Sequence, residues 1–361
     1  MINKTKKITI LFYVEYPYYF PHFIPIGRVF ENFGHEVVYI LSNNQNSENM
    51  ENIVQENNLS YKFGVENLFK LNVDVVFFAN TFDRVEKIDA ITVFLEHGIG
   101  AKSNSFYSGI EYFDIYLVEG NQKLKTISNL YPEHKNKLVK VGFSKFDEVV
   151  NFSTSNKNKL FEKYSLNKSK KTILYAPTFF PSSIEKMADN FPSEFKECNI
   201  IIKPHYLTYE RKNYKKQVDK LHIWQKYSNC IVLPLSEYNL VPFLDIADVM
   251  ISDESSAMFE FAALNKPVVS NRYFKLRWSY YLMPWKLKQR IDKTKESYRS
   301  IFDNANSYIE TLKFTKEALK NPKKLEKNRL NFSSDICGEI DGKVSNRIYE
   351  LILSKLKSKT I

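Results

Sequence analysis

Residues 248–269 read DVMISDESSAMFEFAALNKPVV, and this stretch decides the fold. The apolar run 249–252 ends at Asp253, and a segment of helical pattern begins shortly after it. An apolar run without polar alternation is typical of a strand in a parallel sheet that helices cover on both faces. Ser255 and Ser256 stand where the predicted helix begins, so they either cap its backbone N–H groups or help those groups to bind an anion. Because the turn follows a strand directly, we favour the anion site.

The same alternation of apolar runs and helical stretches extends along the whole chain. It occurs in two series, which predicts an α/β protein with two Rossmann-like domains, each built on a parallel sheet. The predicted strands are 8–14, 36–41, 73–79, 91–95, 114–118 and 138–141 in the first series, and 172–176, 199–203, 230–233, 249–252 and 267–270 in the second.

The polar stretch NFSTSNKNKLFEKYSLNKSKK (151–171) lies between the two series and is rich in Ser, Asn and Lys. Such a composition is typical of a connection, so we place the hinge there. The predicted division is an N-terminal domain over 1–150, a hinge over 151–171 and a C-terminal domain over 172–335. A C-terminal helix over 336–361 is expected to pack back on the first domain.

The composition limits the class of partner. The chain has 52 Lys and Arg and 41 Asp and Glu, which gives a formal charge of +11. This charge favours an anionic partner, which is a nucleotide, a phosphopolymer, a membrane surface or a nucleic acid. Three widely spaced cysteines without a CxxC pair indicate reduced thiols in a cytosolic protein. Glu15 interrupts the N-terminal apolar run, so a first strand is favoured over a signal peptide. No run is long enough to span a membrane, and we expect a cytoplasmic location.

Polar side chains directly follow several predicted strands. Rossmann-like sheets bind ligands beyond the carboxyl ends of their strands, which makes these side chains candidates for a site. His205 and Thr178 are two of these candidates. The alternative to a site residue is, for His205, a strand-ending proline with solvated neighbours. For Thr178, a simple turn explains the pattern equally well. The two glycines of the loop HGIGAK (97–102) let a ligand approach the backbone, although a loop around a core histidine has the same pattern.

The segment 271–291, NRYFKLRWSYYLMPWKLKQRI, interleaves aromatic and basic residues. This pattern is found in segments that bind membrane surfaces and in those that bind nucleic acids. It also fits a partly buried segment between the domains whose aromatic side chains belong to the core, and we favour this last interpretation.

Six motifs occur in a fixed order and together resemble the CDP-glycerol glycerophosphotransferase family, whose members prime or polymerise teichoic-acid-like polymers. Each motif alone is short, but their order matches over most of the chain. The motifs are His97-Gly98-x-x-x-Lys102, Gly142–Asp147, Tyr175–Phe179, Lys203-Pro204-His205, Asp245–Ser256 and Asp341–Ile348.

The resemblance implies a GT-B fold, with two facing Rossmann-like domains and the nucleotide held mainly by the C-terminal one. It implies transfer of an alditol phosphate from a CDP-alditol to an acceptor hydroxyl with release of CMP. Three positions depart from the family pattern: Phe180 stands in place of an Arg, Glu254 in place of a Tyr, and Ser144-Lys145 in place of Pro-Arg. The identity of the alditol therefore stays open, with glycerol favoured.

The resemblance also implies roles for single residues. His97 is expected to be the general base, and His205 to neutralise the diphosphate or the leaving group with support from Lys203. The remaining expectations are hydrogen bonds to the diphosphate from Thr178, Ser255 and Ser256, orientation of these donors by Asp253, and acceptor contacts from His22 and Lys102. No metal-ligand cluster is evident in the sequence, and no obligatory cofactor is expected.

Two other functions remain as alternatives. A GT-B glycosyltransferase that uses a nucleotide sugar for a cell-surface polysaccharide such as a capsule would share the fold and the phosphate-binding helix. A non-catalytic protein that binds a polymer or a membrane is the second alternative. A nucleic-acid binder is disfavoured because the cationic residues are dispersed. The expected partners are a CDP-linked donor and a lipid-linked or oligosaccharide acceptor, with peripheral contact to the inner face of the cytoplasmic membrane.

Overall fold

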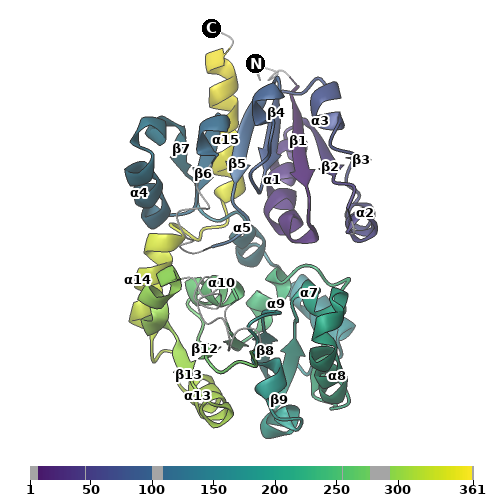
Figure 1. Ribbon diagram of the computed structural model, residues 1–361, viewed down its shortest axis with the longest axis vertical. Helices are drawn as coiled ribbons and strands as arrows, with labels where there is room; N and C mark the ends of the chain where they lie inside the picture. Colours follow the sequence, from purple (N-terminus) through teal and green to yellow (C-terminus); the bar gives the residue numbers. More distant parts are fainter. Residues whose placement is uncertain (1–6, 45, 100–108, 254, 277–292, 360–361) are drawn as a thin grey trace. The chain divides into compact units, whose positions relative to one another are not determined.

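The computed structural model describes residues 7–44, 46–99, 109–253, 255–276 and 293–359 (Figure 1). These residues form two compact units. Unit 1 holds the described residues up to Ile99, those from 109 to Asn151, and the C-terminal segment from Ile336. Unit 2 holds the described part of Phe152–Asp335. The chain therefore returns to unit 1 after completing unit 2.

Unit 1 is built on a parallel sheet with the strand order β3-β2-β1-β4-β5-β6-β7. The chain begins in the middle of the sheet, runs to one edge and then crosses to the other side, which is the doubly wound arrangement. Buried aliphatic and aromatic residues fill the central strands, as a sheet covered on both faces requires. The strands are β1 Thr9–Val14, β2 Glu36–Leu41, β3 Tyr61–Phe63, β4 Val75–Phe78, β5 Ile91–Leu95, β6 Ile115–Val118 and β7 Leu138–Lys140.

The C-terminal helix packs on the first helix of unit 1. Tyr349 of α15 (Val344–Lys359) stacks on Phe33 at a ring-centroid distance of 4.4 Å and contacts Phe30 of α1 (Phe20–Asn32) at 5.1 Å. Aromatic contacts of this kind stabilise a helix beyond its own propensity. The other α-helices described in unit 1 are α2 Ser47–Glu56, α3 Asn67–Lys70, α4 Asn121–Leu130 and α5 Lys145–Val150.

Unit 2 repeats the plan with the order β10-β9-β8-β11-β12-β13, again all parallel. The strands are β8 Lys171–Ala176, β9 Cys198–Ile202, β10 Cys230–Val232, β11 Val249–Ser252, β12 Val268–Asn271 and β13 Asp303–Ala305. The α-helices described here are α6 Thr154–Lys163, α7 Tyr206–Glu210, α8 Lys215–Trp224, α9 Val241–Ile246, α10 Ala257–Ala263, α13 Tyr308–Lys320 and α14 Glu326–Ile336.

The predicted fold class is confirmed, and the differences lie at the sheet edges. The edge strands β3 and β13 have three residues each and were not predicted, because YKF and DNA are not apolar runs. The stretch 151–171, where we place the hinge, contains helix α6. The Ser153 hydroxyl caps α6 by accepting a hydrogen bond from the Asn156 N–H at 3.2 Å, and Lys157 pairs with Asp245 of unit 2 at 2.9 Å. Within the described residues, no helix is long and apolar enough to cross a membrane.

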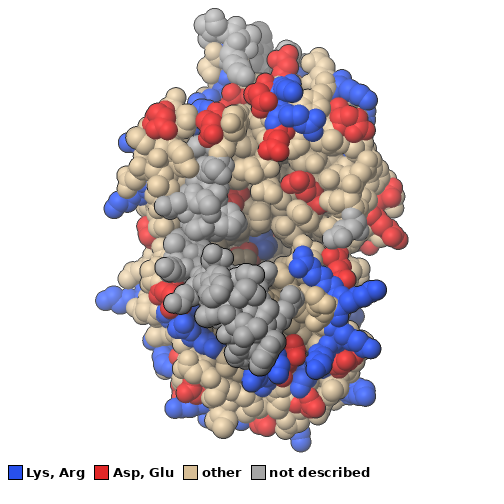
Figure 2. Space-filling view, in the orientation of Figure 1, with Lys and Arg blue, Asp and Glu red and all other residues tan. Residues whose placement is uncertain are grey.

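The positive charge of the chain belongs entirely to unit 2. Residues 152–335 contain 32 Lys and Arg against 20 Asp and Glu, whereas the rest of the chain contains 20 against 21. Figure 2 shows Lys and Arg side chains spread over the face of unit 2 in view, with acidic side chains among them. An anionic ligand is therefore attracted to unit 2 more strongly than to unit 1.

Candidate functional site

His97 lies just beyond β5 in unit 1, and its ring is held in one orientation. Its Nδ1 is 2.8 Å from the carbonyl oxygen of Ala79, which can only accept a hydrogen bond. Nδ1 therefore carries the proton, and in the neutral ring Nε2 has the lone pair. The rings of Tyr18 and Tyr19 each lie 5.2 Å from the imidazole. This arrangement suits the predicted role of His97 as a base, because Nε2 is the atom that can accept a proton.

His22 lies inside unit 1, where it supports the peptide of His97. Its Nε2 is 3.0 Å from the carbonyl oxygen of His97, so Nε2 donates, while Nδ1 is 3.4 Å from the Ser144 hydroxyl and accepts. The side chain is fully buried, and burial together with the nearby charges of Lys145 and His97 holds the pKa of His22 well below its ordinary value. The expected contact of His22 with an acceptor stays a prediction, and the described contacts of the side chain all lie within unit 1.

A cluster of three buried charged side chains lies beside His97, and none of the three was predicted as part of the site. Lys123 of α4 donates to Glu96 at 2.6 Å and to Glu119 at 2.7 Å. Burial alone would lower the pKa of Lys123, but the two carboxylates raise it above its ordinary value. Burial raises the pKa of Glu119, although Lys123 opposes that shift. The i,i+4 spacing of Glu119 and Lys123 was a signal for this cluster.

Two of the six motifs contact each other in unit 1, although they lie far apart in the sequence. Asp147 accepts hydrogen bonds from the backbone N–H groups of Val344 at 3.0 Å and Ser345 at 2.7 Å, at the start of α15. Arg347 donates to the carbonyl oxygen of Val141 at 2.8 Å. Gly142 has φ +100°, and a Cβ there would lie 2.8 Å from Val344, so only glycine fits. These motifs attach the C-terminal helix to unit 1.

In unit 2, Asp253 holds the loop that follows β8. Its carboxylate accepts from the backbone N–H of Thr178 at 2.6 Å and of Ser183 at 3.0 Å, and from the hydroxyls of Ser182 and Ser183 at 3.2 Å each. The side chain is fully buried. Asp253 therefore positions the loop after β8 from inside the protein, and its expected part in binding a phosphate stays a prediction.

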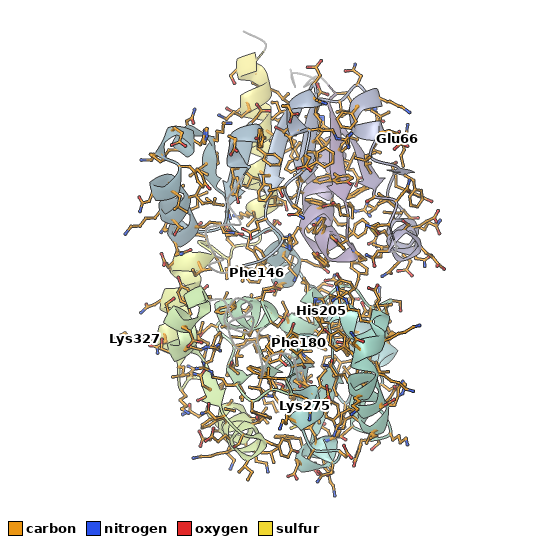
Figure 3. All side chains as sticks on the ribbon, viewed as in Figure 1. Glu66, Phe146, Phe180, His205, Lys275 and Lys327 are labelled. Atoms are coloured by element: carbon orange, nitrogen blue, oxygen red, sulfur yellow. The ribbon has the colours of Figure 1, made fainter. Side chains whose placement is uncertain are left out.

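His205 follows β9 and is held in the opposite tautomer to His97. Its Nδ1 accepts the backbone N–H of Leu207 at 3.2 Å, which caps α7, so the neutral ring carries its proton on Nε2. Burial, followed by the charges of Lys203 and Arg211, lowers the pKa of His205 to about 4. At neutral pH the unliganded protein thus presents an uncharged hydrogen-bond donor at His205, which Figure 3 labels in unit 2. The expected role of His205 at the diphosphate stays a prediction.

The remaining predicted residues of unit 2 lie at the same edge of the sheet. β9, β8 and β11 are neighbours, so Lys203 and His205, Thr178, and the turn after β11 all follow the carboxyl ends of adjacent parallel strands. The Ser255 hydroxyl accepts the Ala257 N–H at 3.2 Å and so caps α10, while Ser256 is exposed.

Other expected features fall partly or wholly outside the described residues. Lys102 and Glu254 lie outside them, as do residues 277–291 of the aromatic and basic segment. At the described start of that segment Asn271 is fully buried and donates to the Ser183 hydroxyl at 3.1 Å, whereas Arg272 and Lys275 are exposed. No group of His, Cys, Asp and Glu that could hold a metal ion occurs among the residues with assigned positions.

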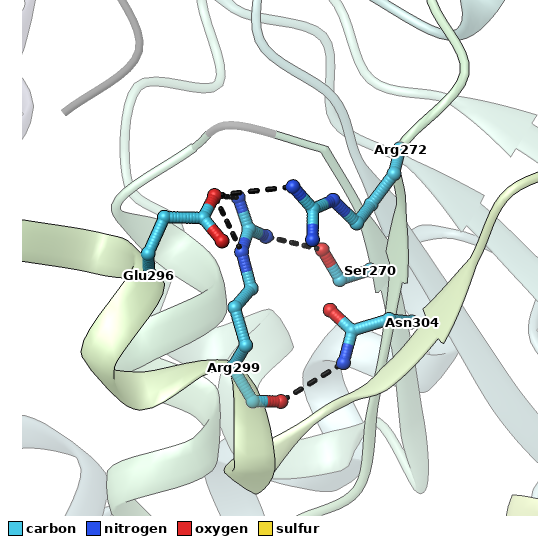
Figure 4. A network of polar contacts seen from close by, with 5 residues as sticks. All are labelled: Ser270, Arg272, Glu296, Arg299 and Asn304. Atoms are coloured by element: carbon cyan, nitrogen blue, oxygen red, sulfur yellow. Dashed lines mark hydrogen bonds and ion pairs between the residues drawn. The ribbon is translucent and has the colours of Figure 1, made fainter. Parts of the chain in front are cut away.

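A second polar network lies at the end of β12 (Figure 4). Glu296 accepts from Arg272 at 3.1 Å and from Arg299 at 3.2 Å, and Arg299 also donates to the Ser270 hydroxyl at 3.1 Å. The Asn304 amide donates to the carbonyl oxygen of Arg299 at 2.9 Å. Both guanidinium groups thus bind a carboxylate within unit 2, which makes this network a connection between β12 and the 3₁₀ helix Lys293–Ile301.

Comparison with known proteins agrees with the motifs. The model of the family described as CDP-Glycerol:Poly(glycerophosphate) glycerophosphotransferase matches residues 96–354. The teichoic acid glycerol-phosphate primase of Bacillus subtilis (strain 168) is 28% identical over 194 residues, which are 54% of this chain and 46% of that protein. The teichoic acid poly(glycerol phosphate) polymerase of Bacillus spizizenii is 27% identical over 169 residues, 43% of this chain and 40% of that one. The chain thus spans less than half the length of these relatives.

Solved structures share the fold. The wall teichoic acid polymerase TagF superposes with a TM-score of 0.72 at 17% identity, covering 99% of this chain and 91% of that one. A UDP-GlcNAc 2-epimerase from Neisseria meningitidis superposes with a TM-score of 0.61 at 11% identity, covering 96% of this chain and 100% of that one. These likenesses establish the GT-B-like architecture. Since the family model matches well over half of the sequence, the chain belongs to the CDP-glycerol:poly(glycerophosphate) glycerophosphotransferase family.

Proposed function

We propose that this protein transfers glycerol phosphate from CDP-glycerol to an acceptor hydroxyl and releases CMP, in the synthesis of a teichoic-acid-like or capsular polymer. The observation that carries the proposal is the opposite tautomers of His97 and His205. One neutral imidazole offers a lone pair on Nε2, and the other offers an N–H on Nε2. Family membership supplies the substrate class.

In the proposed reaction, Nε2 of His97 takes the proton of the acceptor hydroxyl. The acceptor oxygen forms a bond to the β-phosphorus, and the bond from that phosphorus to the bridging oxygen breaks. CMP leaves with the electron pair of the broken bond. His205 donates a hydrogen bond from Nε2 to an oxygen of the diphosphate, where negative charge develops.

Unit 2 is the proposed donor-binding unit, and unit 1 the proposed acceptor side. The excess of Lys and Arg in residues 152–335 supports the first assignment, because the diphosphate is anionic. Lys203, Thr178, Ser255 and Ser256 are the proposed donors to its oxygens, with Ser255 exchanging its capping bond for the ligand. We propose a lipid-linked or oligosaccharide acceptor, and with it a place at the inner face of the cytoplasmic membrane.

Product analysis tests the proposal. The protein is incubated with glycerol-labelled CDP-glycerol and, in parallel, with UDP-sugars, each with a panel of a lipid-linked disaccharide, an oligosaccharide and a glycerol phosphate oligomer. The expected result is CMP together with a labelled phosphodiester, formed by the wild type and far more slowly by His97→Ala. Release of a nucleoside diphosphate with a new glycoside would assign the glycosyltransferase activity instead. Thermal stabilisation by CDP without turnover of any substrate would indicate a binding protein.

A further inference from the structure

Arg211 lies close to His205 and was not among the predicted site residues. It follows α7 directly, and its backbone N–H donates to the carbonyl oxygen of Leu207 at 3.2 Å. Its guanidinium carbon is 5.6 Å from the centroid of the Phe179 ring, and that ring is 4.8 Å from the ring of His205. The side chains of Arg211, Phe179 and His205 thus lie next to one another at the carboxyl edge of the sheet of unit 2, with Phe179 in the middle.

Phe179 is firmly positioned between the other two side chains. The neighbouring Thr178 is bound to Asp253 through its backbone, and the Gln217 side chain donates to the carbonyl oxygen of Phe179 at 3.1 Å. The ring of Tyr214 contacts Phe179 at 5.7 Å from another side. A guanidinium that stacks on such a ring keeps its N–H groups, which point outward in the guanidinium plane, available for a phosphate.

The site also needs positive charge that His205 does not provide. A diphosphate ester carries about two negative charges, whereas the unliganded His205 is neutral at pH 7. Several other cations of unit 2 are already bound within it: Arg272 and Arg299 by Glu296, and Lys266 by the carbonyl oxygens of Leu244, Asp245 and Ala247. Arg211 is exposed and forms no ion pair with any residue the structure describes. Its charge nevertheless acts on the imidazole of His205.

We propose that Arg211 binds the diphosphate of the CDP-activated donor through its guanidinium N–H groups, next to the hydrogen bond from His205. The inference rests on the proposed function and extends it by assigning a cation to the donor site. Arginine suits this task because its planar fork matches two phosphate oxygens at once. The simpler interpretation is a surface arginine that covers Phe179, which would leave ligand binding unchanged.

The experiment compares Arg211→Ala, Arg211→Lys and the control Lys216→Ala for binding of CDP and of cytidine by calorimetry. Lys216 is an exposed cation of α8, so its removal changes the net charge equally. We expect Arg211→Ala to weaken CDP binding by roughly 10- to 100-fold, the range for a hydrogen bond to a charged group, and to leave cytidine binding unchanged. Arg211→Lys should recover part of the loss, since lysine keeps the charge without the fork.

A second readout separates ligand binding from simple packing. Removal of a nearby positive charge should raise the pKa of His205 in Arg211→Ala, measured by NMR titration, while Lys216→Ala leaves it unchanged. Equal affinity of the wild type and Arg211→Ala for CDP overturns the inference, as does an equal loss for CDP and cytidine. If the wild type binds CDP but does not turn over CDP-glycerol, the proposed function fails while the variants still decide the role of Arg211. A wild type that does not bind CDP overturns both.

Discussion

The two site histidines each follow a strand in their own unit, yet the fold prepares them for opposite chemistry. Each follows a buried parallel strand directly. In unit 1 the partner of Nδ1 is the carbonyl oxygen of Ala79, and in unit 2 it is the N–H of Leu207. A single backbone contact thus decides whether Nε2 accepts or donates a proton. The position after a strand marks such a residue in the sequence, but the backbone group that contacts Nδ1 determines its role.

The net charges of the two units differ in the way that their proposed substrates require. Residues 152–335 have 12 more Lys and Arg than Asp and Glu, from 32 against 20, whereas the remainder has one fewer, from 20 against 21. An acceptor hydroxyl is uncharged and needs a base, while a diphosphate needs cations and hydrogen-bond donors. The asymmetry agrees with an acceptor side in unit 1 and a donor side in unit 2.

The contrast between the two histidines predicts that their substitution has its largest effect on kcat. His97→Ala should lower kcat by about 10²- to 10⁴-fold, the usual contribution of a positioned base, and glutamine at 97 should not restore it. For His205, glutamine keeps an N–H near the place of Nε2, so His205→Gln should retain clearly more activity than His205→Ala. Steady-state CMP release at saturating CDP-glycerol measures all four variants. Equal losses for His205→Gln and His205→Ala would contradict the donor role.

The buried cluster beside His97 should dominate the stability of unit 1. Lys123→Ala leaves two buried carboxylates without their cation, and we expect a loss of about 3–5 kcal/mol in the free energy of unfolding. Glu119→Gln should cost less, because the raised pKa of Glu119 indicates that its neutral form is tolerated. Urea unfolding measures both, with Lys125→Ala on the exposed side of α4 as the matched control. A Lys123→Ala protein as stable as that control would refute the expectation.

His22 tests how strongly the base depends on its support. His22→Ala removes the hydrogen bond to the carbonyl oxygen of His97. A bond worth about 1 kcal/mol corresponds to a roughly 5-fold lower kcat. The KM for CDP-glycerol should stay unchanged, because His22 lies in unit 1. His22→Gln, which retains a side-chain N–H, should recover part of the loss. A rise in KM with constant kcat would show that His22 does not act through His97.

Much of this architecture followed from the sequence because the strands are continuous apolar runs. β11 was predicted at its observed bounds, and most other strands to within one or two residues. What the sequence could not supply are contacts between distant segments, such as Asp147 with the start of α15. The tautomers depend on such contacts as well. The burial of His22 had a visible signal, since Phe20, Phe23 and Ile26 surround it on α1.

The smallest expected effect is the pH dependence of stability that His205 contributes. Its pKa of about 4 in the folded protein lies below the ordinary value of about 6.5, so between these values the unfolded chain binds more protons. Stability is therefore complete above pH 6.5 and declines as the pH falls toward 4, by about 1 kcal/mol at pH 5.5 from this group. His22 contributes in the same direction.

Urea unfolding of the wild type and His205→Gln at pH 7.5 and 5.5 measures the difference. Because glutamine does not titrate, the variant should lose less stability on acidification, and an equal loss would mean that His205 is already protonated in the folded state. In that case both histidines would no longer be neutral partners, and the contrast between the two units would rest on charge alone.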